Sequence, residues 1–411
     1  MFSPKFEGDK SEKEKRKRWL FHATDFISLM YPCLTFCRIL GIFPYKINAS
    51  SFETSKPCFI LSTIVMCIFS FCTLIIIYMV IEWFRVNDNN VRKIIEITSL
   101  YVFGSFIVIV TFILSGPRMR FLQTLLKISS RLPSESYQQP SILIHAKDIL
   151  GFFYLLVQSL ICYYKMKEPV IIDVFSLYIT LLGFLMDMLY INCVCVLKAC
   201  FKKINDDLAN LFIMHDEPYS IMRNYHEQRN PLLLIELNAL EKRHLKLSNT
   251  VQRLNIIFSP QLLATTAISF ITITFKLYFN TIEWHNGLYI NLTKQTHHTY
   301  VMVFIAYYFG KIVLIAWACQ TGKNEVMKIN TTIHDALNSV NDEEIKHELQ
   351  LFSLQIMHCD NTFSAKGLNL DATLVATMTA SITTYLLILI QFLIASHSCD
   401  GNTAINVTQT A

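Results

Sequence analysis

Seven long apolar runs constrain this chain more than any other feature. They lie near residues 58–83, 95–115, 142–164, 170–196, 256–282, 299–320 and 370–396. A helix needs about 20 apolar residues to cross roughly 30 Å of hydrocarbon, and inside lipid the backbone must pair its own N–H and C=O groups. Composition agrees, because 53% of the residues are hydrophobic and only 16% are charged. We therefore predict an all-α integral membrane protein with seven transmembrane helices, in the plasma membrane.

Two segments fit this scheme less well than the others. The third run opens with His145, Lys147 and Asp148, so it is the weakest of the seven. Residues 20–45 are apolar but are interrupted by charged residues, a histidine and a proline, which also removes any clean signal-peptide core. We predict a partly inserted interfacial helix there, within a cytoplasmic N-terminal region 1–57.

The distribution of Lys and Arg predicts the orientation. Of 36 such residues, 27 fall on the side of the N-terminus, 6 on the opposite side and 3 within spans. By the positive-inside rule, the N-terminus is cytoplasmic and the C-terminal tail, 397–411, is extracellular. Asn291 and Asn406 then lie outside as glycosylation sites, whereas Asn48 and Asn330 lie inside. The basic run at 13–18 faces the anionic lipid of the inner leaflet, and no nucleic-acid partner is predicted.

Spans 1–4 (58–196) and spans 5–6 (256–320) are separated by long loops, 197–255 and 321–369, which we expect to form a helical cytoplasmic base. Asn230-Pro231 and Asn341 with Glu344 resemble helix starts. Two apolar rows follow at helical spacing: Leu233, Leu237, Leu240, Leu247, Val251 and Leu254, with His244 in the same row, and Ile345, Leu349, Phe352 and Ile356. Such faces pack against other helices and suit subunit assembly.

The last span, 370–396, carries two neighbouring stripes seven residues long. Thr384 and Gln391 share one face, Tyr385 and Phe392 share the next, and Ile388 lies between them. Small hydroxyl residues often serve only close helix packing in lipid. The amide of Gln391 near the end of the span needs a partner or water, however, so a pore wall is the functional hypothesis.

Thr384-Tyr385, five hydrophobic residues and then Gln391-Phe392 in a final span resembles the signature of insect gustatory receptors. Chain length, seven spans, a cytoplasmic N-terminus and a short external tail are also similar to that family. The resemblance implies a ligand-gated, non-selective cation channel for small tastants, a homotetramer or a heteromer with related receptors. It also places Gln391 and Phe392 at the gate. Leu386 stands where sugar receptors of the family carry a glutamate, which argues against that clade.

A ligand pocket in the outer halves of spans two to six is a further implication of the resemblance. Polar and aromatic residues there are Tyr101, Tyr154, Gln158, Asp173, Tyr178, Lys276, Tyr307 and Lys311. For each tyrosine, helix packing or an interfacial belt is the competing interpretation. A charge at membrane depth faces a cavity or a counter-ion, which makes Lys311 informative. Asp187 is a second such charge, whose partner the sequence does not identify.

Other classes of membrane protein fit less well. A G-protein-coupled receptor needs an external N-terminus and motifs that are absent, and a transporter would show a repeat of broken helices. No cluster of metal ligands or nucleophile motif points to an enzyme, and no cofactor is expected. The alternatives that remain are a G-protein-coupled chemoreceptor and a membrane transporter.

Overall fold

The computed structural model describes residues 21–47, 51–86, 91–166, 170–213, 226–285 and 292–408. Its helices are α2 (Phe26–Ile39), α3 (Lys56–Val86), α4 (Val91–Ile113), α5 (Ser115–Ser129), α6 (Glu135–Met166), α7 (Val170–Ile213), α8 (His226–His285), α9 (Leu292–Ser339), α10 (Glu343–His358) and α11 (Ala372–Thr408). Two small antiparallel hairpins complete the fold: β1 (Tyr45–Ile47) with β2 (Phe52–Thr54), and β3 (Ser364–Ala365) with β4 (Leu368–Asn369).

The helices account for all seven predicted spans. Six of the described helices are long and apolar enough to cross a membrane, and α4 with α5 forms a seventh candidate that is bent by 60°. Pro117 contributes to the bend, because proline lacks the N–H that would bond the carbonyl of Ile113 at the end of α4. The all-α, seven-span fold class is therefore confirmed. The side of the membrane on which each terminus lies stays a prediction.

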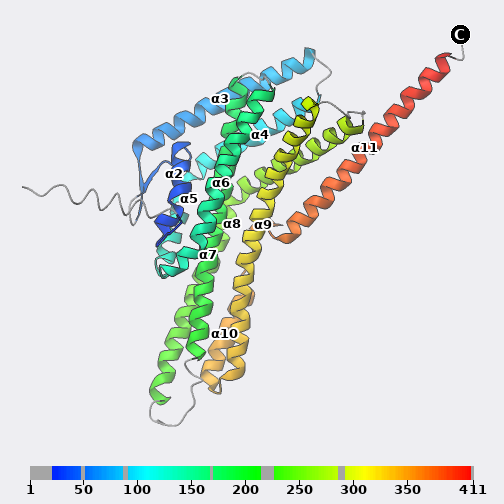
Figure 1. Cartoon of the computed structure of the whole chain (residues 1–411). Helices are drawn as coiled ribbons and strands as arrows, with labels where there is room; N and C mark the ends of the chain where they lie inside the picture. Colours follow the sequence, from blue (N-terminus) through cyan, green and yellow to red (C-terminus); the bar gives the residue numbers. More distant parts are fainter. Residues whose placement is uncertain are drawn as a thin grey trace, which may run out of the picture.

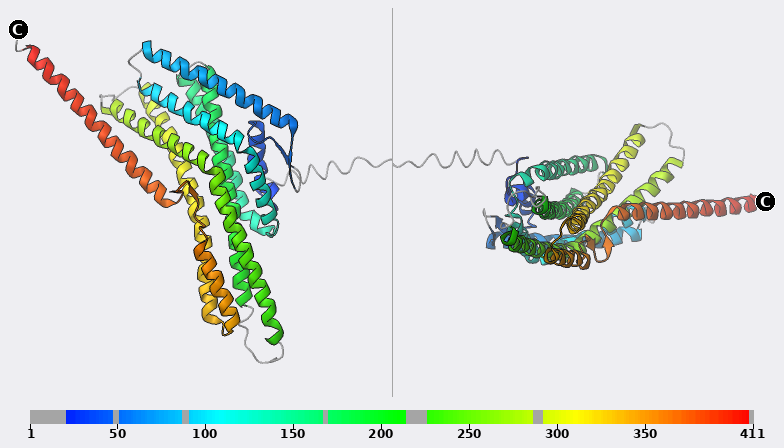
Figure 2. Two further views of the ribbon diagram at one scale, coloured as in Figure 1. Left: turned by 180° about the vertical axis from the view of Figure 1, so that it is seen from behind. Right: turned by 90° about the horizontal axis from the view of Figure 1, so that it is seen from below.

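Helix α7 forms the centre of the bundle. In its most apolar window 94% of the residues are buried within the protein, against 22% for α3 and 17% for α11. Figure 1 and Figure 2 show α7 beside α9. Helix α11 begins beside α9, above α10, and diverges from the bundle towards its C-terminal end. The outer helices therefore present apolar surface that lipid or another subunit must cover.

Two helices extend far beyond a bilayer. Helix α8 has 60 residues and α9 has 48, and at 1.5 Å per residue they are about 90 and 72 Å long. Their lower parts pack with the end of α7 and with α10 (Figure 1). We call this assembly the base: residues 197–213, 226–255 and 321–339, and α10.

The apolar rows of the base are confirmed, but their predicted starts are wrong. Every member of both rows is buried, including His244. Helix α8 begins at His226, so Pro231 lies inside it instead of opening it. Helix α10 is capped by Asp342, whose carboxylate accepts hydrogen bonds from the N–H groups of Glu344 and Ile345. A short acidic side chain can cap from either neighbouring position, so Asn341 was one residue early.

The segment 20–45 forms helix α2, which has 14 residues and is too short to span. Its start is fixed by Asp25 and Ser28, each side chain bonding the backbone N–H of the other. Eight of its residues are buried, and it packs against α6 and α7. The helix is therefore covered by protein over much of its surface, and its interfacial position stays a prediction.

Candidate functional site

A half-enclosed cavity of about 50 Å³ lies between α6, α7 and α9. It is close to the turn between α6 and α7, at the end of the bundle away from the base. Its lining residues are Leu155, Gln158, Ser159, Asp173, Ser176, Leu177, Thr180 and Phe304. The α6 and α7 residues are spaced three and four apart, so each helix contributes one face. This spacing could have identified the five α6 and α7 residues that the sequence analysis missed, but not Phe304 of α9.

Gln158 and Asp173 are the two predicted ligand-binding residues that line this cavity. The side chain of Gln158 is buried, with 4% of its surface exposed, and its Oε1 accepts no hydrogen bond within the described part of the chain. Asp173 faces the same cavity from the first turn of α7 and is half-buried. A buried amide oxygen without a donor is unfavourable, so a water molecule or another donor is expected at this oxygen.

A row of aromatic rings on α9 borders the cavity. Tyr300, Phe304 and Tyr308 follow one another at four-residue spacing, with centroids 4.9 and 6.2 Å apart. The ammonium of Lys276 lies 4.7 Å from the centre of the Phe304 ring, and that of Lys311 lies 5.6 Å from the Tyr308 ring. Each cation is attracted by the negative face of its ring, which fixes the row from two sides.

Tyr154 and Tyr307 join α6 to the same part of α9. Their rings stack with centroids 6.0 Å apart and an interplanar angle of 17°. The Tyr154 hydroxyl also donates to the carbonyl of Val303 at 2.7 Å. The two predicted tyrosines therefore lie next to the cavity and hold one of its walls in place.

Lys311 has the counter-ion that the sequence analysis could not choose. Its Nζ lies 3.1 Å from Oδ2 of Asp187, and both side chains are buried. Gln261 and Thr265 of α8 donate to the other oxygen of Asp187, at 3.1 and 3.2 Å. Arg118 of α5 donates to Gln261 at 3.1 Å, so one buried polar network connects four helices.

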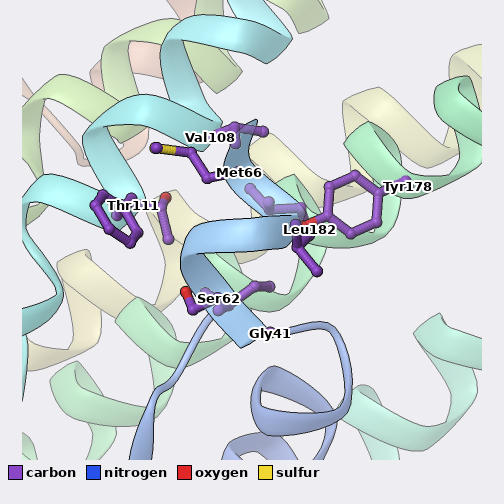
Figure 3. A pocket seen from close by; sticks show the side chains of 10 residues that line it. Gly41, Ser62, Met66, Val108, Thr111, Tyr178 and Leu182 are labelled. Atoms are coloured by element: carbon purple, nitrogen blue, oxygen red, sulfur yellow. The ribbon is translucent and has the colours of Figure 1, made fainter. Parts of the chain in front are cut away.

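Tyr101 and Tyr178 do not line this cavity. The buried Tyr101 donates from α4 to the carbonyl of Ile172 at 3.0 Å. Tyr178 lines a different cavity with Ser62 and Thr111 (Figure 3). That second cavity measures about 20 Å³, which is enough for about one water molecule and too little for a tastant.

The predicted pore residues all lie at exposed positions of α11. Thr384, Tyr385, Ile388, Gln391 and Phe392 are exposed, Phe392 most of all at 72%. The hydroxyl of Thr384 donates to the carbonyl four residues earlier at 2.9 Å, so it needs no other partner. Tyr385 alone of these makes a ring contact, with Phe270 of α8 at 5.9 Å.

The lower end of α11 is attached firmly to α8. Asn255 donates to the carbonyl of Thr362 at 2.8 Å and accepts from the N–H of Ser364 at 3.3 Å. The hydroxyl of Ser259 accepts from the N–H of Lys366 at 3.1 Å, in the turn of the β3–β4 hairpin. These bonds hold the hairpin that leads into α11.

Asp371 then caps the first turn of α11. Its carboxylate accepts from the N–H of Thr373 at 3.0 Å and from the hydroxyl of the same residue. Nζ of Lys323 lies 3.9 Å from the same carboxylate. The negative charge also suits the start of a helix.

The remaining site predictions are placed as follows. Asn291 lies outside the described residues, and Asn406 lies in the last turns of α11, where side chains are not described. In the described ranges, no three His, Cys, Asp or Glu side chains come together as metal ligands.

Comparison with known proteins identifies relatives. A family described as 7tm chemosensory receptor matches residues 30–396. Two Drosophila melanogaster proteins, putative gustatory receptors 28b and 28a, are 31% identical over 168 residues and 30% identical over 161. These matches cover 40% and 38% of the chain, and they span 35% of the length of each relative.

Solved structures resemble the whole fold. The insect olfactory receptor OR5 from Machilis hrabei has a TM-score of 0.67 at 11% identity, and its complex with eugenol has 0.65 at 13%. Each alignment covers 88% of this chain and 97% of the other. At such low identity the likeness shows that the fold is shared.

Proposed function

Because the chain belongs to the 7tm chemosensory receptor family, we propose that it is a gustatory receptor acting as a ligand-gated, non-selective cation channel. The family consists of multi-pass membrane receptors and not of enzymes. Its proposed ligands are small-molecule tastants, and the receptor falls outside the main sugar clade. The proposed assembly is a homotetramer or a heteromer with related receptors, embedded in lipid.

The observation that carries this proposal is the exposed face of α11. Only 17% of its apolar window is buried, so lipid or other subunits must cover it. Gln391 is exposed on this helix, and a primary amide is poorly suited to lipid but well suited to a watery pore. Several copies around one axis would bring Gln391 and Phe392 together, and a ring of Phe392 side chains would close the path by excluding water.

Ligands would bind in the cavity between α6, α7 and α9. It combines apolar walls with a few polar groups, as small-molecule sites do. The similar olfactory receptor was solved with the small phenol eugenol, which supports a small organic ligand here.

Patch-clamp recording of cells that express the chain alone, with G-protein signalling blocked, tests the channel. We expect a panel of tastants to evoke cation current. Phe392→Ala should raise the basal leak because a smaller side chain lets the constriction fill with water, and Gln391→Ala should change the evoked current. Phe59→Ala on α3 is the matched control, because Phe59 is also an exposed apolar residue of a span. Unchanged currents in both α11 variants would remove the pore assignment.

Glycosylation mapping tests the orientation. With the N-terminus inside, Asn406 can be modified and Asn48 cannot. The reverse result would contradict the topology and favour the G-protein-coupled alternative, which needs an external N-terminus.

A further inference from the structure

The cavity contains a buried hydrogen-bond acceptor beside an apolar wall. Gln158 presents a buried Oε1 that no donor of the described chain reaches, and Asp173 adds a carboxylate. The hydroxyl of Thr180 already donates to the carbonyl of Ser176 at 2.8 Å, so only its lone pairs are left for a guest. A guest that only accepts hydrogen bonds can bond the hydroxyls of Ser159 and Ser176, but it leaves Oε1 of Gln158 unsatisfied.

From this lining we propose that the cavity selects ligands that donate a hydrogen bond, with a hydroxyl of an alcohol or phenol directed at Oε1 of Gln158. The proposal rests on the proposed function in taking this cavity as the ligand site. It adds the chemical class of the ligand and the residue that recognises it.

The other walls define the rest of the ligand. Leu155, Leu177 and Phe304 give the cavity an apolar side, and Lys276 lies 4.7 Å from the centre of the Phe304 ring. The volume of about 50 Å³ exceeds the roughly 30 Å³ that one water molecule occupies. It therefore admits the hydroxyl-bearing end of a molecule, while a small apolar or aromatic body lies along the open side.

Matched probes test the hydrogen bond, and the Gln158 variants then separate its effect from that of size. Phenol and anisole, or 4-ethylphenol and 4-ethylanisole, differ in whether the oxygen carries a hydrogen or a methyl group. We would measure their dissociation constants for the full-length chain, purified in lipid nanodiscs. We expect each phenol to bind about tenfold more tightly than its methyl ether, since the ether cannot satisfy the buried amide.

Gln158→Leu should abolish this preference, so that phenol and ether have about equal dissociation constants, mainly because the phenol binds less tightly. Removing an unsatisfied buried amide should leave the unliganded protein no less stable, and Gln158→Met is a second variant should the leucine variant fail to accumulate. Gln252→Leu makes the same chemical change at an exposed position of α8 and should keep the tenfold preference.

Three results would overturn the inference: ethers that bind as tightly as their phenols, no binding by any phenol tested, or a preference that survives in Gln158→Leu. Because the measurement is binding and not current, its outcome is independent of conduction. A chain that binds phenols through Gln158 but carries no current would keep this inference and contradict the channel.

Discussion

The buried ion pair between Asp187 and Lys311 gives the sharpest test of how the bundle is held together. Neither side chain is more than 8% exposed, and the pair links the central helix α7 to α9. Breaking a buried pair by removing one partner costs about 3–5 kcal/mol, because the other charge is left buried and uncompensated. Replacing both partners with apolar residues of similar size is often nearly neutral.

The surroundings decide where in this range each variant falls. Lys311→Met leaves Asp187 with two donors, Gln261 and Thr265, so we expect a loss of about 3 kcal/mol. Asp187→Leu leaves Lys311 with the ring of Tyr308, and a loss of about 4–5 kcal/mol follows. In the double variant both charges are gone and the two α8 donors lose an acceptor, which costs about 1–2 kcal/mol in a membrane protein.

Denaturation of the purified receptor in detergent, followed by tryptophan fluorescence, measures all four proteins. The double variant should be more stable than either single variant, with a coupling energy of about 5–7 kcal/mol in the double-mutant cycle. Losses that simply add, or single variants within about 1 kcal/mol of the wild type, would refute the reasoning.

Two further predictions concern packing and pH. Gly151→Ala should destabilise the protein by about 1–3 kcal/mol, because a Cβ there would lie 2.4 Å from the ring of Phe184; Gly310→Ala, with nothing within 4 Å, is the control and should be neutral or stabilising in the same melting assay. In the base, outside the 256–282 span, burial lowers the pKa of His244 to about 4, below the roughly 6.5 of the unfolded chain. The neutral ring is therefore favoured by folding, so this contribution is complete above about pH 6.5 and is lost as the pH falls towards 4, by about 3 kcal/mol in total. His244→Phe should weaken the acid dependence of the melting temperature, and an unchanged pH profile would contradict the assignment.

Hydropathy predicted the spans because length and apolar content are properties of each helix alone. It could not predict that α7 is central and α11 peripheral, since both are equally apolar and only packing separates a side chain buried in protein from one that faces lipid. The rows of the base were predictable for the same local reason. Their starts were not, because Asn230-Pro231 is a valid start signal that a longer helix can contain.

In the candidate site, too, some residues could be predicted from the sequence and their partners could not. Single residues such as Gln158, Asp173 and Lys311 were recognisable because polar groups are rare in apolar runs. Their partners were not, since Asp187 and Lys311 are 124 positions apart and pair only through the fold. Tyr178 was a reasonable choice by residue type and depth, but it faces a space of about 20 Å³ behind α3.

The attachment of α11 at one end has a mechanical consequence. Asn255 and Ser259 hold the hairpin before the helix, while the far part of α11 stands clear of the bundle (Figure 2). From Asp371 to Phe392 the helix rises about 30 Å at 1.5 Å per residue. A rotation of about 5° about the fixed end therefore moves the Phe392 ring by about 2.7 Å, close to the diameter of a water molecule. A slight tilt of the attachment to Asn255 and Ser259 of α8 is therefore magnified at the opposite end of α11.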